Sequence, residues 1–312
     1  MSIPRLVDPA SLPEALARPV VAIGNFDGVH AGHRDIIWHA RDIAERSARP
    51  VVALTFSPHP RQYFAPNAAH FVLTSPDIQT ELLAGIYVAG VVVLTFNSAL
   101  ASLGAEDFIR SILLERLAAS AVVVGEGFRF GKARSGTTAT LEAAGKSSGF
   151  GVWIVPSRLD GEIGVSSTRI RAALAAGDLG EANRLLEYEW FVRGPVIHGE
   201  KRGRDLGYPT ANMKLDPSCA LKHGIYAVRV TIDGVVHPGV ASFGRRPTFD
   251  NGAPLLETHV FDFKGDLYDR SVDVAFVRYL RGEEKFDSID ALVVQMDRDS
   301  AEARKVLALP KI

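Results

Sequence analysis

Two histidines three residues apart, His30 and His33, follow a short apolar segment in the stretch Gly-Asn-Phe-Asp-Gly-Val-His-Ala-Gly-His, residues 24–33. This stretch contains three glycines, Gly24, Gly28 and Gly32. Glycine lets the backbone come close to phosphate groups, and an amphipathic segment starting near Arg34 predicts a helix whose N-terminus favours an anion at the same place. The spacing therefore indicates a site for the triphosphate of a nucleotide, with both histidines facing the phosphates.

A His-x-x-His pair also fits two simpler roles, a helix cap or adventitious metal binding, and the spacing alone does not separate them from phosphate binding. The whole ten-residue stretch is more specific, because it resembles the HxGH signature of the nucleotidyltransferase superfamily. The resemblance implies that His30 and His33 stabilise charge building on the α-phosphate and on the departing pyrophosphate. No nucleophilic side chain is needed in such a reaction.

Composition and charge are those of an ordinary globular protein. The chain has 312 residues, 47% hydrophobic and 23% charged, which is enough for two domains. A formal net charge of −1 gives no basic field, so neither nucleic acid nor membrane is expected as a partner. Cys219 is the only cysteine, which excludes an intramolecular disulfide. With no signal pattern in residues 1–19 and no apolar run of membrane-spanning length, the expected location is the cytoplasm.

The first part of the chain alternates β-branched segments with segments of helical spacing, which predicts a parallel α/β sheet covered on both faces. The predicted strands are residues 20–23, 51–56, 91–96, 122–124 and 152–155. Ligands bind beyond the carboxyl ends of the strands in such sheets. We therefore expect three unusual loops to converge there, residues 24–33, 57–60 and 125–131.

After Trp190 the pattern changes to strict alternation, which predicts an antiparallel sheet or barrel. One strand carries its apolar residues on a single face, at Tyr226, Val228, Val230 and Ile232. Asp233-Gly234 follows as a tight turn, and Ser288–Leu307 is amphipathic and is expected to form a closing helix. A domain boundary is therefore expected near residues 186–190.

Two further segments of the first part fit a phosphate site. His59 stands between two prolines at a predicted strand end, in a stiff loop that would hold it near the phosphates; a rigid surface turn explains it equally well in isolation. Ser166-Ser167-Thr168-Arg169-Ile170-Arg171 predicts a helix start that faces an anion, with Arg171 one turn further on, although a plain N-cap explains Ser167 alone.

Taken in order, these motifs and Val-Gly-Glu-x-Phe-Arg-Phe-Gly from Val124 resemble the adenylyltransferase half of the bifunctional riboflavin kinase/FAD synthetase family. The resemblance implies a Rossmann-like nucleotidyltransferase domain. It also implies a set of nucleotide-binding residues: Gly24, Phe26, Asp27, Gly28, Gly32, His59, Gly125, Phe128, Ser167, Thr168 and Arg171.

The second part resembles the riboflavin kinase signature through Gly194–Gly199 and Gly203–Asn212, which ends in Pro-Thr-Ala-Asn. Thr210 and Asn212 lie two apart on one face of an extended segment, so hydroxyl and amide oxygens can share one hard cation that carries ATP phosphates. A turn with a satisfied Thr and Asn is the simpler interpretation of these four residues alone. The nucleotide-binding residues implied here are Gly199, Gly203, Arg204 and Gly207.

An alternating segment, residues 255–263, predicts a strand with Glu257 on the same face as His259 and Phe261. Phosphorylation of a primary alcohol requires removal of its proton, and a positioned carboxylate is a suitable base. We therefore predict Glu257 as the catalytic base of the kinase. A solvated strand face is the alternative.

Three positions depart from the family pattern, which otherwise extends over about residues 18–307. Gly127 stands where the family usually has Asp or Asn, which removes a polar contact to nucleotide or metal. Tyr87 begins Tyr-Val-Ala where the family has Gly-Val-Asp, a change expected to affect packing. Asp269 replaces a common glycine, so strain is expected in that turn.

The resemblance implies an enzyme that converts riboflavin to FMN and FMN to FAD, with ATP as co-substrate and Mg²⁺ accompanying each ATP. Residues 1–186 would form the FMN adenylyltransferase domain, and residues 187–312 a riboflavin kinase domain built as a six-stranded Greek-key β-barrel with a closing helix. One alternative, motivated by Gly127, is a monofunctional riboflavin kinase with a degenerate nucleotide-binding domain. A flavin sensor or nucleic-acid-binding protein is disfavoured, because no basic stripe with interleaved aromatics is present.

Overall fold

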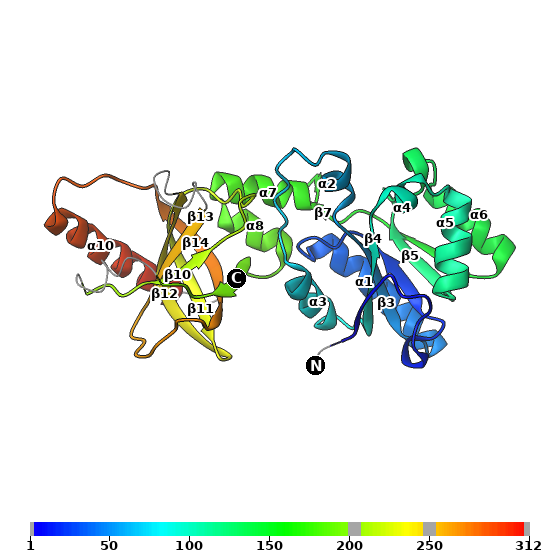
Figure 1. Cartoon of the computed structure of the whole chain (residues 1–312), viewed down its shortest axis with the longest axis horizontal. Coiled ribbons are helices and arrows are strands. Elements are labelled where there is room, and N and C mark those ends of the chain that lie inside the picture. The colour runs from blue at the N-terminus through cyan, green and yellow to red at the C-terminus, as the bar shows by residue number, and fades with distance from the viewer. Residues whose placement is uncertain (1–2, 199–206, 246–253, 309–312) are drawn as a thin grey trace. The chain divides into compact units, whose positions relative to one another are not determined.

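The computed structural model describes residues 3–198, 207–245 and 254–308, and the chain divides into two compact units, residues 1–167 and 168–312 (Figure 1). Among the helices of these described residues, none is long and apolar enough to cross a membrane. The two units have different architectures, as the change in sequence pattern predicts.

The first unit contains a six-stranded parallel sheet in the order β1-β4-β3-β2-β5-β6. Its strands are β1 Arg5–Val7, β2 Val20–Ile23, β3 Val51–Ser57, β4 Gly90–Thr95, β5 Ala121–Gly125 and β6 Gly151–Val155. The five predicted strands are confirmed. The edge strand β1 was not predicted, because three residues are too few to show a period of two.

Helices cover both faces of this sheet (Figure 1). They are α1 Ala31–Ser47, α2 Pro60–Phe64, α3 Pro76–Ala84, α4 Ser98–Ser102, α5 Ala105–Phe108, the π-helix Ile109–Arg116 and α6 Thr138–Ser148. Short 3₁₀ helices at Glu14–Leu16 and Lys132–Arg134 and a small hairpin, β7 Leu159–Asp160 and β8 Ile163–Gly164, complete the unit.

Successive strand residues point to opposite faces, which explains the almost wholly apolar strands. Val20 of β2 packs in the cluster that contains Ile37 of α1, whereas Val21 packs in the cluster that contains Leu113 of the π-helix and Leu141 of α6. The predicted doubly covered parallel sheet is therefore confirmed.

The second unit is a six-stranded antiparallel sheet in the order β10-β13-β12-β11-β14-β9. The elements after β8 are α7 Ser167–Ala176, α8 Leu179–Leu186, β9 Phe191–Pro195, β10 Ala211–Lys214, β11 Gly224–Ile232, β12 Val235–Arg245, β13 Pro254–Val260, β14 Ser271–Arg281 and α10 Ile289–Ala308. A bridge between Ile197 and Asn212 brings the end of β9 beside β10, so the sheet curls into a nearly closed barrel.

The barrel and its helix agree with the sequence pattern. Tyr226 and Phe276 are fully buried inside, with ring centroids 5.2 Å apart. α10 packs on the outer face, where Ala303 joins Ala227 and Phe261 in one apolar cluster. The predicted barrel, closing helix and Asp233-Gly234 turn between β11 and β12 are confirmed.

Two departures from the family pattern fall on left-handed backbone. Tyr87 has φ 73° and Asp269 has φ 61°, at the two positions where the resemblance implies glycine. Since a Cβ is disfavoured in this region, the expected strain at Asp269 is present in its backbone. At Tyr87 the exposed ring lies under the guanidinium of Arg41, 4.1 Å from the ring centroid.

Candidate active sites

The two histidines of the HxGH stretch lie at the carboxyl end of β2, where α1 begins. His30 is the N-cap of α1, and its ring Nδ1 accepts a hydrogen bond from the backbone N–H of His33 at 3.3 Å. The two rings stack with centroids 3.6 Å apart and an interplanar angle of 16°. His30 therefore does cap the helix. Capping also places both rings at the helix N-terminus, so it is compatible with anion binding there.

The His33 ring is poised as a neutral hydrogen-bonding group. Burial first, and the neighbouring charge of His30 second, lower the pKa of His33 well below its ordinary value. Its Nδ1 is buried and has no hydrogen-bond partner among the described residues. A buried polar atom without a partner is costly, so its presence at a helix N-terminus indicates a place for a ligand.

A buried clamp holds the loop before these histidines. Asp27 Oδ1 accepts hydrogen bonds from the backbone N–H groups of Leu73 (2.8 Å) and Thr74 (3.3 Å), while the backbone N–H of Gly28 donates to Thr74 Oγ1 at 3.1 Å. Asp27 and Thr74 are 4% and 5% exposed, and the ring of Phe26 is fully buried. Asp27 Oδ1 therefore anchors the loop, and a nucleotide contact by Phe26 has to come from its backbone.

The loop backbone is strained and tied at several points. Phe26 has φ 49° and the β-branched Val29 has φ 38°. Such conformations cost on the order of 1–3 kcal/mol each and persist only where the surroundings fix them. Besides the clamp, the carbonyl of Asn25 accepts from the Thr55 hydroxyl at 3.1 Å and from the Gln79 amide at 2.9 Å. The loop is therefore preorganised in the free protein.

The other predicted glycines of this loop make room for rings. A Cβ at Gly24 would lie 3.2 Å from the Phe26 ring, and a Cβ at Gly32 would lie 3.4 Å from the His30 ring. Gly28 has φ 81°, which a side chain disfavours. Ser167 reaches the same loop from far along the chain, since its hydroxyl donates to the Asp27 carbonyl at 2.9 Å. Thr168 and Arg171 follow in α7, within the second unit.

The loop after β3 carries His59 as the N-cap of α2. Its ring nitrogen accepts from the backbone N–H of Arg61 at 3.1 Å, and its ring lies 4.5 Å from that of His70. His59 therefore takes part in the turn itself, and its contact with a nucleotide stays a prediction. Because β3 is paired directly with β2, the turn also stands at the strand edge that carries His30 and His33.

An aromatic cluster at this edge was missed from the sequence. It comprises Phe56, Tyr63, Phe64 and Phe96, at the ends of β3, α2 and β4, and neighbouring ring centroids lie 5.2–6.2 Å apart. Phe64 is 69% exposed although it belongs to this cluster. Aromatic residues spread over 40 positions give no local pattern, so only the fold identifies an aromatic cluster with an exposed ring here.

The loop after β5 contains the remaining predicted residues of the first unit. Gly125 ends β5, and the Phe128 ring stacks on Phe130 with centroids 5.4 Å apart. Gly127 is exposed, and a Cβ built there meets no atom within 4 Å. The departure at Gly127 therefore removes a side chain that the fold has room for, and disturbs no packing.

Replacing Thr74 by Val tests the clamp. The variant loses the oxygen that accepts from Gly28, a buried interaction whose loss is expected to cost about 1–3 kcal/mol in the free energy of unfolding. The matched control, Thr74→Ser, keeps this oxygen. Chemical denaturation of both variants measures the effect, and equal stability of Thr74→Val and the parent would show that the Thr74 hydroxyl contributes nothing to the clamp.

In the second unit, the strand register brings the predicted kinase residues together. Asn212 of β10 and Ser242 of β12 both lie directly opposite Glu257 of β13. Directly opposite residues of antiparallel strands share a face, so Asn212 and Glu257 point to the same side of the sheet. Asn212 is 6% exposed, and its amide nitrogen lies 3.4 Å from the carbonyl of Thr210.

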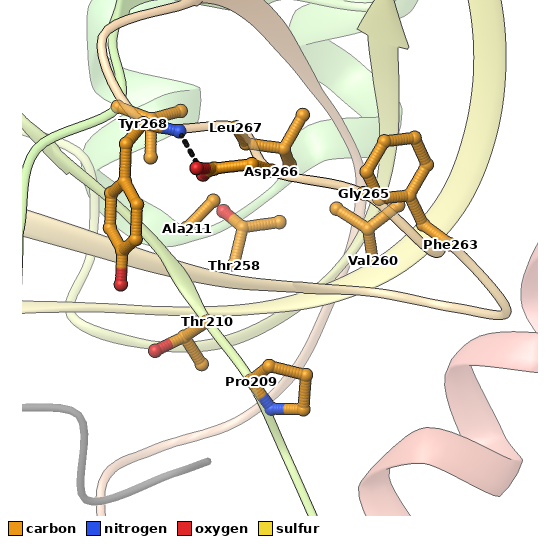
Figure 2. Close-up of a pocket in the computed structure, with 11 residues that line it drawn as sticks. Pro209, Thr210, Ala211, Thr258, Val260, Phe263, Gly265, Asp266, Leu267 and Tyr268 are labelled. Atoms are coloured by element: carbon orange, nitrogen blue, oxygen red, sulfur yellow. Dashed lines mark hydrogen bonds between the residues drawn. The ribbon is translucent and has the colours of Figure 1, made fainter.

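An open pocket lies beside Thr210 (Figure 2). The entry to β10, strand β13 and the loop 263–268 supply most of its lining: Val196, Pro209, Thr210, Ala211, Thr258, Val260, Phe263, Gly265, Asp266, Leu267 and Tyr268. Asn212 and Glu257 are outside this lining. Phe263 and Tyr268 place two aromatic rings in the lining of this open pocket, which suits an aromatic base.

Several predicted residues cannot be placed. Gly199, Gly203 and Arg204 lie outside the described residues, whereas Gly207 has φ 82°, a conformation that favours glycine. Among the described residues, no group of three or more His, Cys, Asp or Glu is placed to hold a metal. The oxygens of Thr210 and Asn212 nevertheless fit Mg²⁺ carried by a nucleotide, because that cation takes few protein ligands and completes its shell with phosphates and water.

The end of strand β14 is tied to α10. Arg281 at the end of β14 forms a paired contact with Asp299 of α10, at 2.8 Å from Nε and 2.6 Å from Nη2. The Gln295 amide donates to the same carboxylate at 2.9 Å. The Asp299 carboxylate, held in this way, raises the pKa of Arg281. This network holds the closing helix against the barrel.

Two known protein families match the two parts of the chain separately. The family model for FAD synthetase matches residues 12–169, and that for riboflavin kinase matches residues 186–307. A bifunctional riboflavin kinase/FMN adenylyltransferase from Pseudomonas fluorescens is 42% identical over 291 residues, 93% of each chain. The protein of the same description from Escherichia coli (strain K12) is 36% identical over 293 residues, 94% of each chain.

A solved structure extends this likeness to three dimensions. A Streptococcus pneumoniae protein called a macrolide-efflux protein superposes with a TM-score of 0.87 and 32% identity, over 97% of this chain and 99% of that chain. That name describes transport, whereas the descriptions of both family models and of the two relatives above name enzymes. The agreement in fold covers both units.

Proposed function

The chain belongs to the bifunctional riboflavin kinase/FMN adenylyltransferase family, and from this premise we propose which residues carry each reaction. The protein phosphorylates riboflavin to FMN with ATP, and then adenylylates FMN with a second ATP to give FAD and pyrophosphate. The monofunctional alternative is not supported, because the FAD synthetase family model and the bifunctional relatives cover the first unit.

One observation carries the assignment of the adenylyltransferase centre. It is the stacked His30–His33 pair on a strained, clamped loop at the N-terminus of a 17-residue helix. In the proposed step a phosphate oxygen of FMN bonds to the α-phosphorus of ATP while the bond to the β-phosphate breaks. The two rings donate hydrogen bonds to the charge that develops on the α-phosphate and pyrophosphate. Since the loop is already fixed, little reorganisation is needed at that moment.

The flavin ring needs a flat apolar surface next to these histidines. The exposed ring of Phe64 offers one, because it stands in the segment that follows β3, the neighbour of β2. We propose that the isoalloxazine ring of FMN stacks on Phe64, which directs its phosphate toward His30 and His33. Gly125, Phe128, Ser167, Thr168 and Arg171 remain proposed nucleotide contacts.

In the kinase centre, Glu257 takes the proton of the ribityl hydroxyl as that oxygen bonds to the γ-phosphorus of ATP and ADP departs. The proposal rests on the cross-strand placement of Glu257 opposite Asn212, the second residue of the metal pair. Magnesium bound with ATP supplies positive charge to the phosphates, and Thr210 and Asn212 would hold it. The pocket beside Thr210 is the proposed place of the adenosine.

A cytoplasmic location is proposed as well. Burial raises the pKa of the single cysteine, Cys219, to about 11, so its thiol stays protonated and unreactive near neutral pH. A protein with one inert thiol and a requirement for two ATP molecules suits a reducing, ATP-rich compartment.

The proposed boundary between the two activities, residues 186 and 187, differs from the division by compactness at residue 167. The intervening helix α8 packs on the barrel, because Asn183 donates to the Phe276 carbonyl at 2.9 Å and accepts from the Trp190 N–H at 2.8 Å. Two leucines of α8, Leu185 and Leu186, are buried. This helix is therefore a structural part of the kinase unit.

Two fragments test the proposal. Residues 187–312 are expected to make FMN from riboflavin and no FAD, because every proposed kinase residue lies beyond the boundary. Residues 168–312, which keep α8, are expected to unfold at a higher temperature and to make FMN equally fast. FMN production that needs residues 1–167 would contradict the independence of the kinase.

A further inference from the structure

Immediately before the metal pair, the chain is fastened to the neighbouring strand by a histidine. His259 Nδ1 lies 2.9 Å from the carbonyl oxygen of Pro209, the residue that precedes Thr210. A carbonyl oxygen only accepts, so Nδ1 must carry the proton and donate it. His259 stands two residues after Glu257 on β13, on the same face.

The preceding residue extends this contact to the closing helix. The ring of Tyr208 packs against that of His259 with centroids 5.0 Å apart, and its hydroxyl donates to the Asp297 carboxylate of α10. A carboxylate oxygen only accepts, so the phenol is the donor in this contact. One short segment, Tyr208-Pro209, therefore touches both the strand of the proposed base and α10.

The His259 ring is itself supported. It makes an edge contact with Phe261, 5.7 Å between centroids, and Arg304 of α10 lies over Phe261 at 4.2 Å from the ring centroid. Arg304 also pairs with Asp262 at 2.8 and 3.0 Å. The donor nitrogen of His259 is thus held in place from β13 and from α10 together.

We propose that His259 and Tyr208 are positioning residues of the kinase: by holding the Pro209 carbonyl and the Asp297 carboxylate, they set the segment that presents Thr210 and Asn212 to magnesium and ATP. This inference rests on the proposed kinase activity. Neither residue touches a reacting atom, and their effect passes through the backbone of Pro209. The requirement for magnesium and ATP should therefore change more than the turnover at saturation.

Two substitutions of one residue separate the hydrogen bond from the packing. The amide nitrogen of Asn is as many bonds from Cα as Nδ1 of His, so His259→Asn keeps a donor for the Pro209 carbonyl, whereas His259→Leu keeps bulk without a donor. In the full chain, FMN formation from riboflavin is measured against magnesium and ATP concentration. His259→Leu should raise both half-saturating concentrations about three- to tenfold, as expected for one lost hydrogen bond, with turnover within about threefold. His259→Asn should restore the parental values.

The temperature at which the kinase unit unfolds, measured in the same full-chain preparations, reports whether the barrel that carries His259 is folded. If His259→Leu fails this control, Tyr208→Phe replaces it, because that variant keeps the ring and loses only the bond to Asp297; it should shift the same two concentrations. Parental magnesium and ATP requirements in the variant would overturn the proposal, as would a loss in His259→Asn equal to that in His259→Leu. FMN formation by the parental protein tests the proposed kinase activity itself, independently of the comparison between the variants.

Discussion

Replacing both His30 and His33 by Ala is expected to abolish FAD formation, while FMN formation from riboflavin persists. The two rings are proposed to donate to charge that exists only as the bond to the α-phosphorus changes. Loss of one such donor commonly lowers turnover by about 10²–10³-fold. The measurement is the rate of FAD formation with FMN as the only flavin, beside the rate of FMN formation from riboflavin in the same preparation.

A matched control is available on the same helix. His39 of α1 is exposed, and its ring bonds to the carbonyl of Asp35 at 2.8 Å, outside the proposed centre. His39→Ala is expected to form FAD at the parental rate. FAD formation at the parental rate by the His30/His33 double variant would mean that these rings serve only as cap and filling of the helix N-terminus.

Exchange of Glu257 for Gln is expected to lower the turnover of the kinase by about 10²–10⁴-fold, the usual range for a lost general base. Gln keeps the shape and much of the hydrogen bonding, so riboflavin affinity should change little. Turnover and the half-saturating riboflavin concentration are measured separately. FAD formation from FMN in the same protein is expected to be unchanged.

Two results would revise the role of Glu257. Parental kinase turnover would make it a solvated residue of the strand face. A weaker affinity for riboflavin at unchanged turnover would make it a binding group, and the base would have to be sought elsewhere in the kinase unit.

The fold was predictable where a pattern is local. The strands β2 to β6 are covered on both faces and therefore appear in the sequence as short, β-branched apolar segments, whereas the 20-residue α10 shows a helical period. The hairpin β7–β8 has two residues in each strand and shows no such period. The grouping of α8 with the barrel depends on bonds such as that from Asn183 to Phe276, 93 residues away.

The candidate sites divide in the same way. His30, His33 and the Thr210–Asn212 pair stand in contiguous motifs, so the sequence alone was enough to predict them as site residues. The role of Thr74 in the clamp was not predicted, because its hydrogen bond with Gly28 joins residues 46 positions apart and no motif surrounds Thr74 in the sequence. The role of Asp27 Oδ1 as an anchor was not predictable either. Its partners are backbone N–H groups of another segment, and a backbone group leaves no signal in the sequence.

The central claim, that one chain makes FMN and then FAD, is tested most directly by separating the flavins formed over time from riboflavin, ATP and magnesium. FMN is expected to appear first with one ADP per molecule, followed by FAD with one pyrophosphate per molecule. Accumulation of FMN without FAD, persisting when FMN is supplied as the only flavin, would contradict the account.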